Sequence, residues 1–189
     1  MTVSTTSNFM DLAPGAGRNQ IDQAALLRGE ILLNTRSHSA WGGAVTAQMY
    51  LPLARSQAWQ QLTDYPRWVQ YFPDLTHSEV VHWGDELTQG SKRLYQTANK
   101  AFLFFSAQVE IYVKVFEIVQ QQIQFRLERG SFLDFSSDIK LQDCGTGTLL
   151  TYSVQATPTI PIPGMFIEQA MKLDLPINMR KMRQVLCGC

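Results

Sequence analysis

Alternating apolar and polar positions mark the middle of the chain as a series of strands. The clearest run spans residues 102–116, where the odd positions are mostly apolar and the even positions after Phe104 include Gln108, Glu110 and Lys114. Side chains of a strand point alternately to its two faces, so this period of two predicts one buried and one solvated face. The same reasoning predicts strands at 30–35, 44–51, 77–83, 91–98, 119–127, 133–141 and 148–156.

Two of these predicted strands define a hairpin near the end of the series. Leu133, Phe135, Ile139 and Leu141 are expected on the buried face of the first strand, while Asp134 and Asp138 lie on its solvated face. Gly145-Thr146-Gly147 then forms the turn. Consecutive strands joined by such short turns predict an antiparallel sheet.

Helical spacing appears at the two ends of the strand series. Residues 21–27 and 54–62 predict short helices, and Asp64 is a plausible cap for another at 66–71. A long helix is expected from Pro163 to about Leu186, and Pro176 inside it should kink or restart it, with Asp174 as the cap. Its first half presents one apolar arc, which consists of Phe166, Ile167, Ala170, Met171 and Leu173.

These elements predict an α+β fold. A curved antiparallel sheet of six to seven strands would wrap on the long C-terminal helix, with two short helices after the first core strand. The buried face of the sheet needs a cover, and the last helix is the only large apolar helix available. Because one helix cannot fill the concavity of a strongly curved sheet, we expect a cavity between them.

Length and composition indicate an ordinary globular chain. Residues 1–20 are expected to form a flexible leader and residues 21–189 a single domain. Sixteen basic and sixteen acidic residues cancel, which argues against nucleic acid as a partner. The best basic cluster, Arg180, Lys181 and Arg183, favours a solvated helix end over a site for phosphate or a lipid headgroup.

Cysteine usage and hydropathy bear on location. Cys144, Cys187 and Cys189 are an odd number, and two of them are almost terminal, so they do not predict a disulfide framework. A reducing compartment fits best, and we expect a cytoplasmic protein. No apolar run is long enough for a membrane span, although a transient membrane contact stays open.

Four stretches resemble the polyketide cyclase/dehydrase and START-like lipid-transport superfamily. They are LPLARSQAWQQLTDYPRWVQYFPDL at residues 51–75, GSFLDF at 130–135, GTLLTYSV at 147–154 and DLPIN at 174–178. The resemblance covers most of the chain, from about Gly29 to Leu186. One departure follows Phe135, where this superfamily often has a tryptophan and the chain has Ser136, Ser137 and Asp138.

This resemblance implies the helix-grip fold, shared with the birch-pollen-allergen proteins, and a central pocket. Members of the superfamily include aromatase/cyclases, coenzyme-Q-binding proteins and carriers of sterols or phospholipids. No catalytic residue is common to all of them, so the resemblance assigns none to this chain.

The residues themselves give no sign of catalytic machinery. His38, His77 and His82 lie far apart in the sequence, with His38 in a polar loop, so a metal site is not predicted. No nucleophile with a matched base is evident, no cofactor motif occurs, and Asp134 and Asp138 read as solvated carboxylates.

The residues predicted to line the pocket come from the short helix, the strands and the last helix. Three of them are polar. These three would form hydrogen bonds either with a ligand or with one another and with trapped water. The aromatic residues among them would form either core or a gate. The predicted ligand-binding set is Trp68, Phe72, Leu94, Gln96, Phe105, Ala107, Val109, Leu127, Phe135, Ser137, Ile139, Tyr152, Phe166, Ala170 and Leu173.

Three hypotheses about function follow. The first is binding or transport of a small apolar ligand, such as a lipid, quinone, isoprenoid or polyketide-like molecule. The second is a cyclase or dehydratase that acts on a polyketide-like substrate, for which Tyr152 is the obvious proton donor and Arg93 the charged residue to locate. The third is a structural or interaction protein with a closed core. The oligomeric state stays open.

Overall fold

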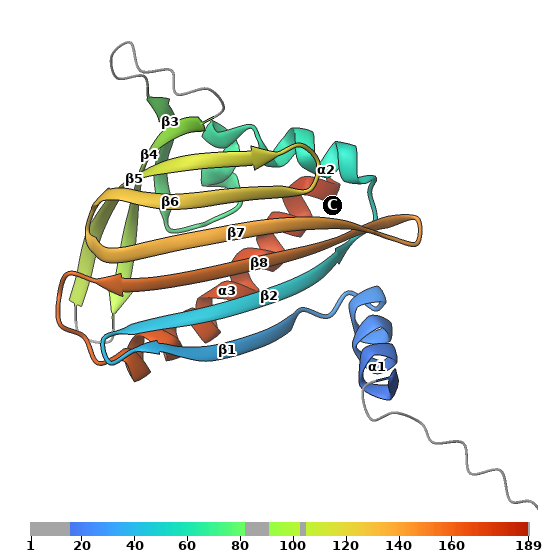
Figure 1. Cartoon of the computed structure of the whole chain (residues 1–189), viewed down its shortest axis with the longest axis horizontal. Helices are drawn as coiled ribbons and strands as arrows, with labels where there is room; N and C mark the ends of the chain where they lie inside the picture. Colours follow the sequence, from blue (N-terminus) through green and yellow to red (C-terminus); the bar gives the residue numbers. More distant parts are fainter. Residues whose placement is uncertain (1–15, 82–90, 103–104, 189) are drawn as a thin grey trace, which may run out of the picture.

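A computed structural model describes residues 16–81, 91–102 and 105–188 of the chain (Figure 1). Its elements in chain order are α1 (Ala16–Leu27), β1 (Leu32–Ser39), β2 (Gly42–Leu51), α2 (Arg55–Leu62), η1 (Tyr65–Gln70), β3 (Leu75–Val81), β4 (Ser91–Phe102), β5 (Phe105–Ile118), β6 (Gln122–Gly130), β7 (Phe132–Cys144), β8 (Gly147–Pro158) and α3 (Gly164–Cys187).

The described strands form one antiparallel sheet in the order β1-β2-β8-β7-β6-β5-β4-β3. Strands β3 to β8 pair with their neighbours in the chain, while β2 pairs with β8 and so joins the two ends of the chain. The α+β class and the antiparallel sheet are confirmed. The sheet has eight described strands instead of the six to seven expected, because residues 32–39 join its edge as β1.

Helix α3 runs diagonally behind the strands in Figure 1 and packs against the inner face of the sheet. The helix is continuous from Gly164 to Cys187, so it does not restart at Asp174, and Pro176 lies inside it. The backbone N–H of Gly164 donates to the carbonyl of Ala40, at 2.8 Å, which fixes the start of α3 against the β1–β2 turn.

Helices α2 and η1 lie between β2 and β3, as predicted, and they close one end of the space under the sheet (Figure 1). η1 is a 3₁₀ helix with Pro66 in its first turn and Asp64 at its N-cap, although the Asp64 side chain makes no capping hydrogen bond. The Trp68 indole Nε1 donates to the carbonyl of Leu62, at 2.9 Å, and so ties the two helices together.

Several predicted boundaries were wrong. Helix α1 begins at Ala16, five residues before the predicted start, and His38 lies in β1 instead of a loop. The run at 102–116 belongs to β4 and β5, which pair Phe102 with Phe105. Leu133 is 71% exposed instead of buried, because the β7–β8 pairing shifts register between Phe132 and Asp134. Residues 1–15, His82 and Cys189 lie outside the described residues.

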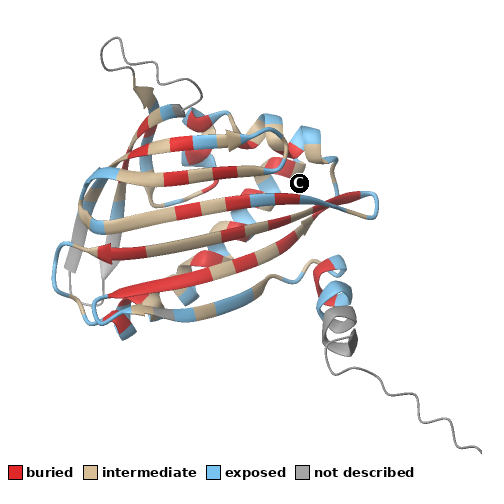
Figure 2. Cartoon of the chain, in the orientation of Figure 1, coloured by how far each residue is buried: buried red, intermediate tan, exposed pale blue. Residues whose placement is uncertain are grey.

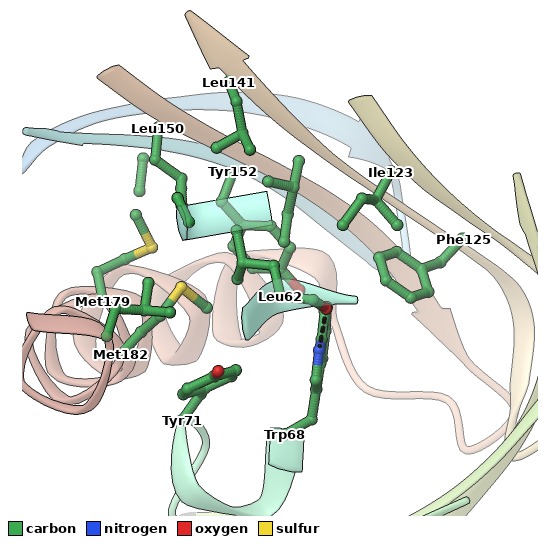
Figure 3. Close-up of a cluster of buried hydrophobic side chains, with 14 of the residues drawn as sticks. Leu62, Trp68, Tyr71, Ile123, Phe125, Leu141, Leu150, Tyr152, Met179 and Met182 are labelled. Carbon is green, nitrogen blue, oxygen red and sulfur yellow. Dashed lines mark hydrogen bonds between the residues drawn. The ribbon is translucent and has the colours of Figure 1, made fainter. Parts of the chain in front are cut away.

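The core occupies only part of the space between the sheet and α3. Buried residues alternate along the strands, as Figure 2 shows, and this confirms the period of two. The largest buried cluster gathers where α2 and η1 meet the second half of α3 (Figure 3). Its labelled members are Leu62, Trp68, Tyr71, Ile123, Phe125, Leu141, Leu150, Tyr152, Met179 and Met182.

Candidate functional site

A cavity of about 350 Å³ lies between the inner face of the sheet and α3, and it is partly open to solvent. The first half of α3 contributes Ile167, Ala170 and Met171 to its wall, whereas Met179 and Met182 of the second half are buried in the core. The same helix therefore covers filled core with one half and cavity with the other. Most of the wall is apolar, as is typical of small-molecule sites.

Aromatic rings separate the cavity from the filled core. The ring centroids of Trp68 and Phe72 lie 5.5 Å apart in a stacked arrangement, and those of Trp68 and Phe125 lie 4.8 Å apart. Phe72 also contacts Tyr152, with 6.0 Å between their centroids. Trp68 is buried in the core and lines the cavity as well, so the alternatives of core and pocket wall both apply to it.

Tyr152 and Ser137 place hydroxyl groups inside this apolar wall. Ser137 on β7 and Tyr152 on β8 lie on the same face of neighbouring strands. Burial raises the pKa of Tyr152 to about 12, and the nearby Ser137 hydroxyl offsets part of this rise. The phenol therefore stays protonated at neutral pH and can donate a hydrogen bond, but it cannot act as a base.

Gln96 is the third buried polar residue on the cavity wall that the sequence predicted. Its Nε2 donates to Ser78 Oγ at 3.0 Å, and Ser78 Oγ in turn donates to the carbonyl of Tyr65 at 2.8 Å. This chain of bonds fixes the amide of β4 against β3 and η1. Gln96 thus adds a neutral polar group whose position is set by the fold.

The only charged residues in the described lining are acidic. Asp74, Glu110 and Asp174 line the cavity from the segment after η1, from β5 and from α3. Neither lysine, arginine nor histidine occurs among the described lining residues. Arg93 points away, because its Nε donates to both carboxylate oxygens of Glu128 at 3.0 Å. The wall thus disfavours an anionic ligand.

Eight predicted ligand-binding residues lie on the cavity wall. They come from η1 and the segment just after it, from four strands and from α3. They are Trp68, Phe72, Gln96, Val109, Phe135, Ser137, Tyr152 and Ala170.

The other predicted residues lie elsewhere. Leu94 and Ile139 are fully buried in the core, because these positions lie on the correct side of the sheet but beyond the cavity, and Leu127 is half-buried and does not line the cavity. Phe105 and Ala107 lie outside the residues whose side chains are described.

Phe166 and Leu173 are on the outside of α3, with exposed fractions of 47% and 61%. The arc that faces the cavity passes through Ala170, Asp174 and Asn178 instead. The pattern missed Asp174 and Asn178 because polar residues on a helix normally indicate its solvated side. Both residues follow Ala170 in steps of four, and this helical spacing was the signal that could have placed them on the cavity side.

The outer face of the sheet carries a polar cluster away from the cavity. His38 Nε2 lies 2.8 Å from Asp134 Oδ2, and the Thr157 hydroxyl donates to the same oxygen at 2.9 Å. Asp138 accepts from Arg126 Nη2 at 2.9 Å, so the two aspartates are held in networks instead of being freely solvated. No hydroxyl is bonded to His38 in the part of the chain that the structure describes, so this cluster does not form a nucleophile–base pair.

The described residues also bear on metal binding, on the cysteines and on membrane-spanning helices. Within the described residues, no group of three or more His, Cys, Asp or Glu side chains is placed to hold a metal ion. Cys144 is a free thiol. Among the described helices, none combines the length and the apolar character that a membrane crossing requires.

Solved structures share the fold of this chain. A START superfamily protein from Mycobacterium smegmatis aligns with a TM-score of 0.62 at 14% identity, covering 77% of this chain and 97% of that one. A STAR-related lipid transfer protein from Xanthomonas axonopodis gives 0.57 at 14%, covering 82% and 98%. The Zhui aromatase/cyclase from Streptomyces sp. R1128 gives 0.59 at 11%, covering 78% and 92%. The fold is the helix-grip fold.

The sequence identifies the family more narrowly. Residues 51–183 match the family described as polyketide cyclase / dehydrase and lipid transport, and the chain belongs to that family. No curated protein matches the sequence.

Proposed function

We propose that this chain binds a small, apolar, uncharged molecule in the cavity under its sheet. The observation that carries the proposal is a cavity of about 350 Å³ whose wall is mostly apolar and holds a few buried neutral polar groups. Burial of apolar ligand surface would supply most of the affinity, at roughly 25 cal/mol per Å². Membership of a family that includes lipid transport supports the same function.

The volume favours a compact ligand. It lies at the lower end of the range for small-molecule pockets and would hold roughly a dozen water molecules. A fused ring system, a quinone head or a single short isoprenoid chain suits this space. A phospholipid with two long chains does not suit it, unless the chains extend out of the opening.

The polar groups favour an uncharged ligand that can accept a hydrogen bond. Tyr152 offers a protonated phenol, while the described lining contains no lysine, arginine or histidine that would neutralise a carboxylate or phosphate. Among otherwise similar ligands, we therefore expect an alcohol or ketone to bind more tightly than the corresponding acid. Trp68, Phe72, Gln96, Val109, Phe135, Ser137 and Ala170 would complete the site.

Filling the cavity tests this proposal. Ala170→Trp places an indole inside the cavity, so binding of farnesol and menadione, measured by native mass spectrometry and fluorescence quenching, should fall by at least about tenfold. The melting temperature should hold or rise, because filling an apolar cavity commonly stabilises a fold. Gln169→Trp, at the exposed neighbouring position, is the matched control.

Two results would contradict the proposal. One is the absence of any co-purified or added apolar ligand on the wild-type protein at micromolar concentration. The other is equal binding by the wild-type protein and the Ala170→Trp variant, since the ligand would then lie elsewhere.

A cyclase or dehydratase that acts on a polyketide-like substrate is the second candidate. One observation favours it: a buried phenol, able to donate a hydrogen bond, lines the same cavity as Asp74 and Asp174. General acid–base chemistry needs such a donor together with a base. If a linear poly-β-ketone is converted, both Tyr152→Phe and Asp174→Asn should lower the rate by at least about tenfold. If the poly-β-ketone binds but is not converted, the enzyme function is contradicted and the carrier function remains.

Two further expectations about the chain are proposals as well. Residues 21–189 would act as one domain, which the single eight-stranded sheet of the described residues supports. A cytoplasmic location would suit the free thiol of Cys144, because cytosolic cysteines are normally reduced.

A further inference from the structure

The outer face of α3 carries apolar side chains that nothing in the described structure covers. Met165, Phe166, Leu173 and Ile177 have exposed fractions of 70%, 47%, 61% and 53%. At about 100° per residue, these four positions fall within an arc of about 120°. They form an apolar stripe along the outer side of the helix, which the exposed Gln169 interrupts, and the cavity-lining residues of α3 lie on the other side.

Basic residues accompany this stripe. Every exposed charged residue of α3 is basic, and these residues are Lys172, Arg180 and Lys181. Lys172 and Lys181 lie on opposite edges of the stripe by the same helical geometry. The acidic residues of α3 are half-buried: Glu168 pairs with Lys172 at 3.2 Å, and Asp174 lines the cavity.

We propose that this outer face of α3 docks on the surface of an anionic lipid bilayer. An apolar stripe flanked by basic side chains is the pattern of helices that lie in the membrane interface, where apolar groups enter the acyl boundary and lysines reach the headgroups. Negative lipids attract such basic residues. The helix would lie on the membrane without crossing it.

Two further apolar residues are exposed near the start of α3. The hydrogen bond from Gly164 to the carbonyl of Ala40 holds the β1–β2 turn against this end of the helix, and that turn presents Trp41 with an exposed fraction of 49%. Ile160, just before α3, is 48% exposed and also lines the cavity. Tryptophan is favoured at membrane interfaces. Figure 1 shows the β1–β2 turn and the start of α3 at the same end of the molecule.

Charge favours a bilayer over a second copy of this chain. A second copy would present the same exposed basic residues, Lys172, Arg180 and Lys181, and so would offer them no opposite charge in a two-fold pairing, whereas anionic headgroups would. A bilayer is also the natural source of an apolar ligand, and the cavity lies on the other side of the same helix. That last connection rests on the function proposed above, whereas the docking surface itself does not.

Vesicle sedimentation with the full chain tests the inference. The protein should bind vesicles of equimolar phosphatidylcholine and phosphatidylglycerol more tightly than vesicles of phosphatidylcholine alone, and added salt should weaken the binding. Arg180→Gln with Lys181→Gln should reduce binding to the anionic vesicles roughly 25-fold, since each basic residue contributes about a fivefold factor. Phe166→Ser with Leu173→Ser and Ile177→Ser should reduce it at least about tenfold.

Matched variants separate docking from general surface effects. Lys92→Gln with Lys140→Gln, and Ile118→Ser with Val119→Ser, change exposed residues of the strands and of the β5–β6 turn and should leave vesicle binding unchanged. All variants should bind farnesol in solution as the wild type does, so a failure of docking is distinguishable from a failure of cavity binding. The inference is overturned if wild-type protein ignores anionic vesicles, if the control pairs lose binding equally, or if the α3 variants only dissociate a dimer.

Discussion

The surroundings of Tyr152 determine the chemical properties of its side chain more than the residue type does. Its phenol is buried between the sheet and α3, and this burial raises its pKa to about 12. The hydroxyl lies near that of Ser137, and the ring contacts Phe72. One side chain thus joins the aromatic boundary of the core to the polar part of the cavity wall.

Tyr152→Phe should separate these two roles. The ring remains, so the fold should lose only about 1 kcal/mol from the missing hydrogen bond. Binding of menadione, which has carbonyl acceptors, should fall by about tenfold, while binding of a hydrocarbon of similar size should change little. Urea denaturation and ligand titration measure the two effects.

Tyr95→Phe provides the control for that experiment. Its hydroxyl lies 3.3 Å from a carboxylate oxygen of Glu110, and Tyr95 is not among the residues that line the cavity. Menadione binding should therefore be unchanged. Equal affinity of the wild-type protein and Tyr152→Phe for menadione would remove Tyr152 from the site.

At the scale of elements, the strand β6 shows how local irregularity sets the curvature around the cavity. The β5–β6 pairing shifts register between Tyr112 and Val113, and β6 ends at Gly130 with a φ of 142°. The next residue, Ser131, donates its backbone N–H to the carbonyl of Glu110 at 2.8 Å. Both Glu110 and Ser131 line the cavity, so this junction positions part of its rim.

Gly130→Ala should therefore be strongly destabilising. The added Cβ would overlap the carbonyl oxygen of Glu110 and lie 2.8 Å from the Cα of Ile111, and the backbone conformation itself favours glycine. We expect a loss of about 3 kcal/mol in the free energy of unfolding, measured by chemical denaturation.

Gly145→Ala is the comparison for that variant. Gly145 also has a positive φ, of 59°, but an added Cβ there meets open space. Its cost should be only about 1–2 kcal/mol. If the two substitutions cost the same, the close contact at Gly130 does not restrict the junction.

For the whole molecule, buried tyrosines make stability depend on alkaline pH. Burial raises the pKa of both Tyr71 and Tyr152 to about 12 and also raises the pKa of Tyr65, whose hydroxyl donates to Glu117 Oε1 at 2.5 Å. An unfolded tyrosine loses its proton near pH 10, while these folded ones keep theirs. The unfolded state therefore gains relative stability as the pH rises above 10.

We expect the free energy of unfolding to be fully retained below pH 10 and to fall as the pH rises through about 12. Tyr152 alone would contribute a loss of roughly 3 kcal/mol over this range. Urea denaturation between pH 8 and pH 12 measures the slope, and Tyr152→Phe should make it shallower. Stability that stays level, or rises, above pH 10 would contradict this prediction.

How much of the site could be predicted depends on the kind of element. Gln96, Ser137 and Tyr152 were placed on the cavity side by strand alternation alone, because a period of two leaves only two faces to choose from. Phe166 and Leu173 were misplaced, because α3 carries apolar residues on two sides and an apolar arc does not say which side meets the sheet. Leu94 and Ile139 were placed on the correct face, but where the core ends along that face depends on α2 and η1.

Local pattern by itself thus determined the strands, their buried faces and the need for a covering helix, since these depend on neighbouring side chains and backbone geometry. The family resemblance, also present in the sequence, indicated the helix-grip fold. Only the tertiary structure decided how far the core fills the space under the sheet and which arc of α3 faces that space. It also decided how strongly the pKa of Tyr152 is raised. These properties arise from contacts between segments far apart in the chain, and no local pattern records such contacts.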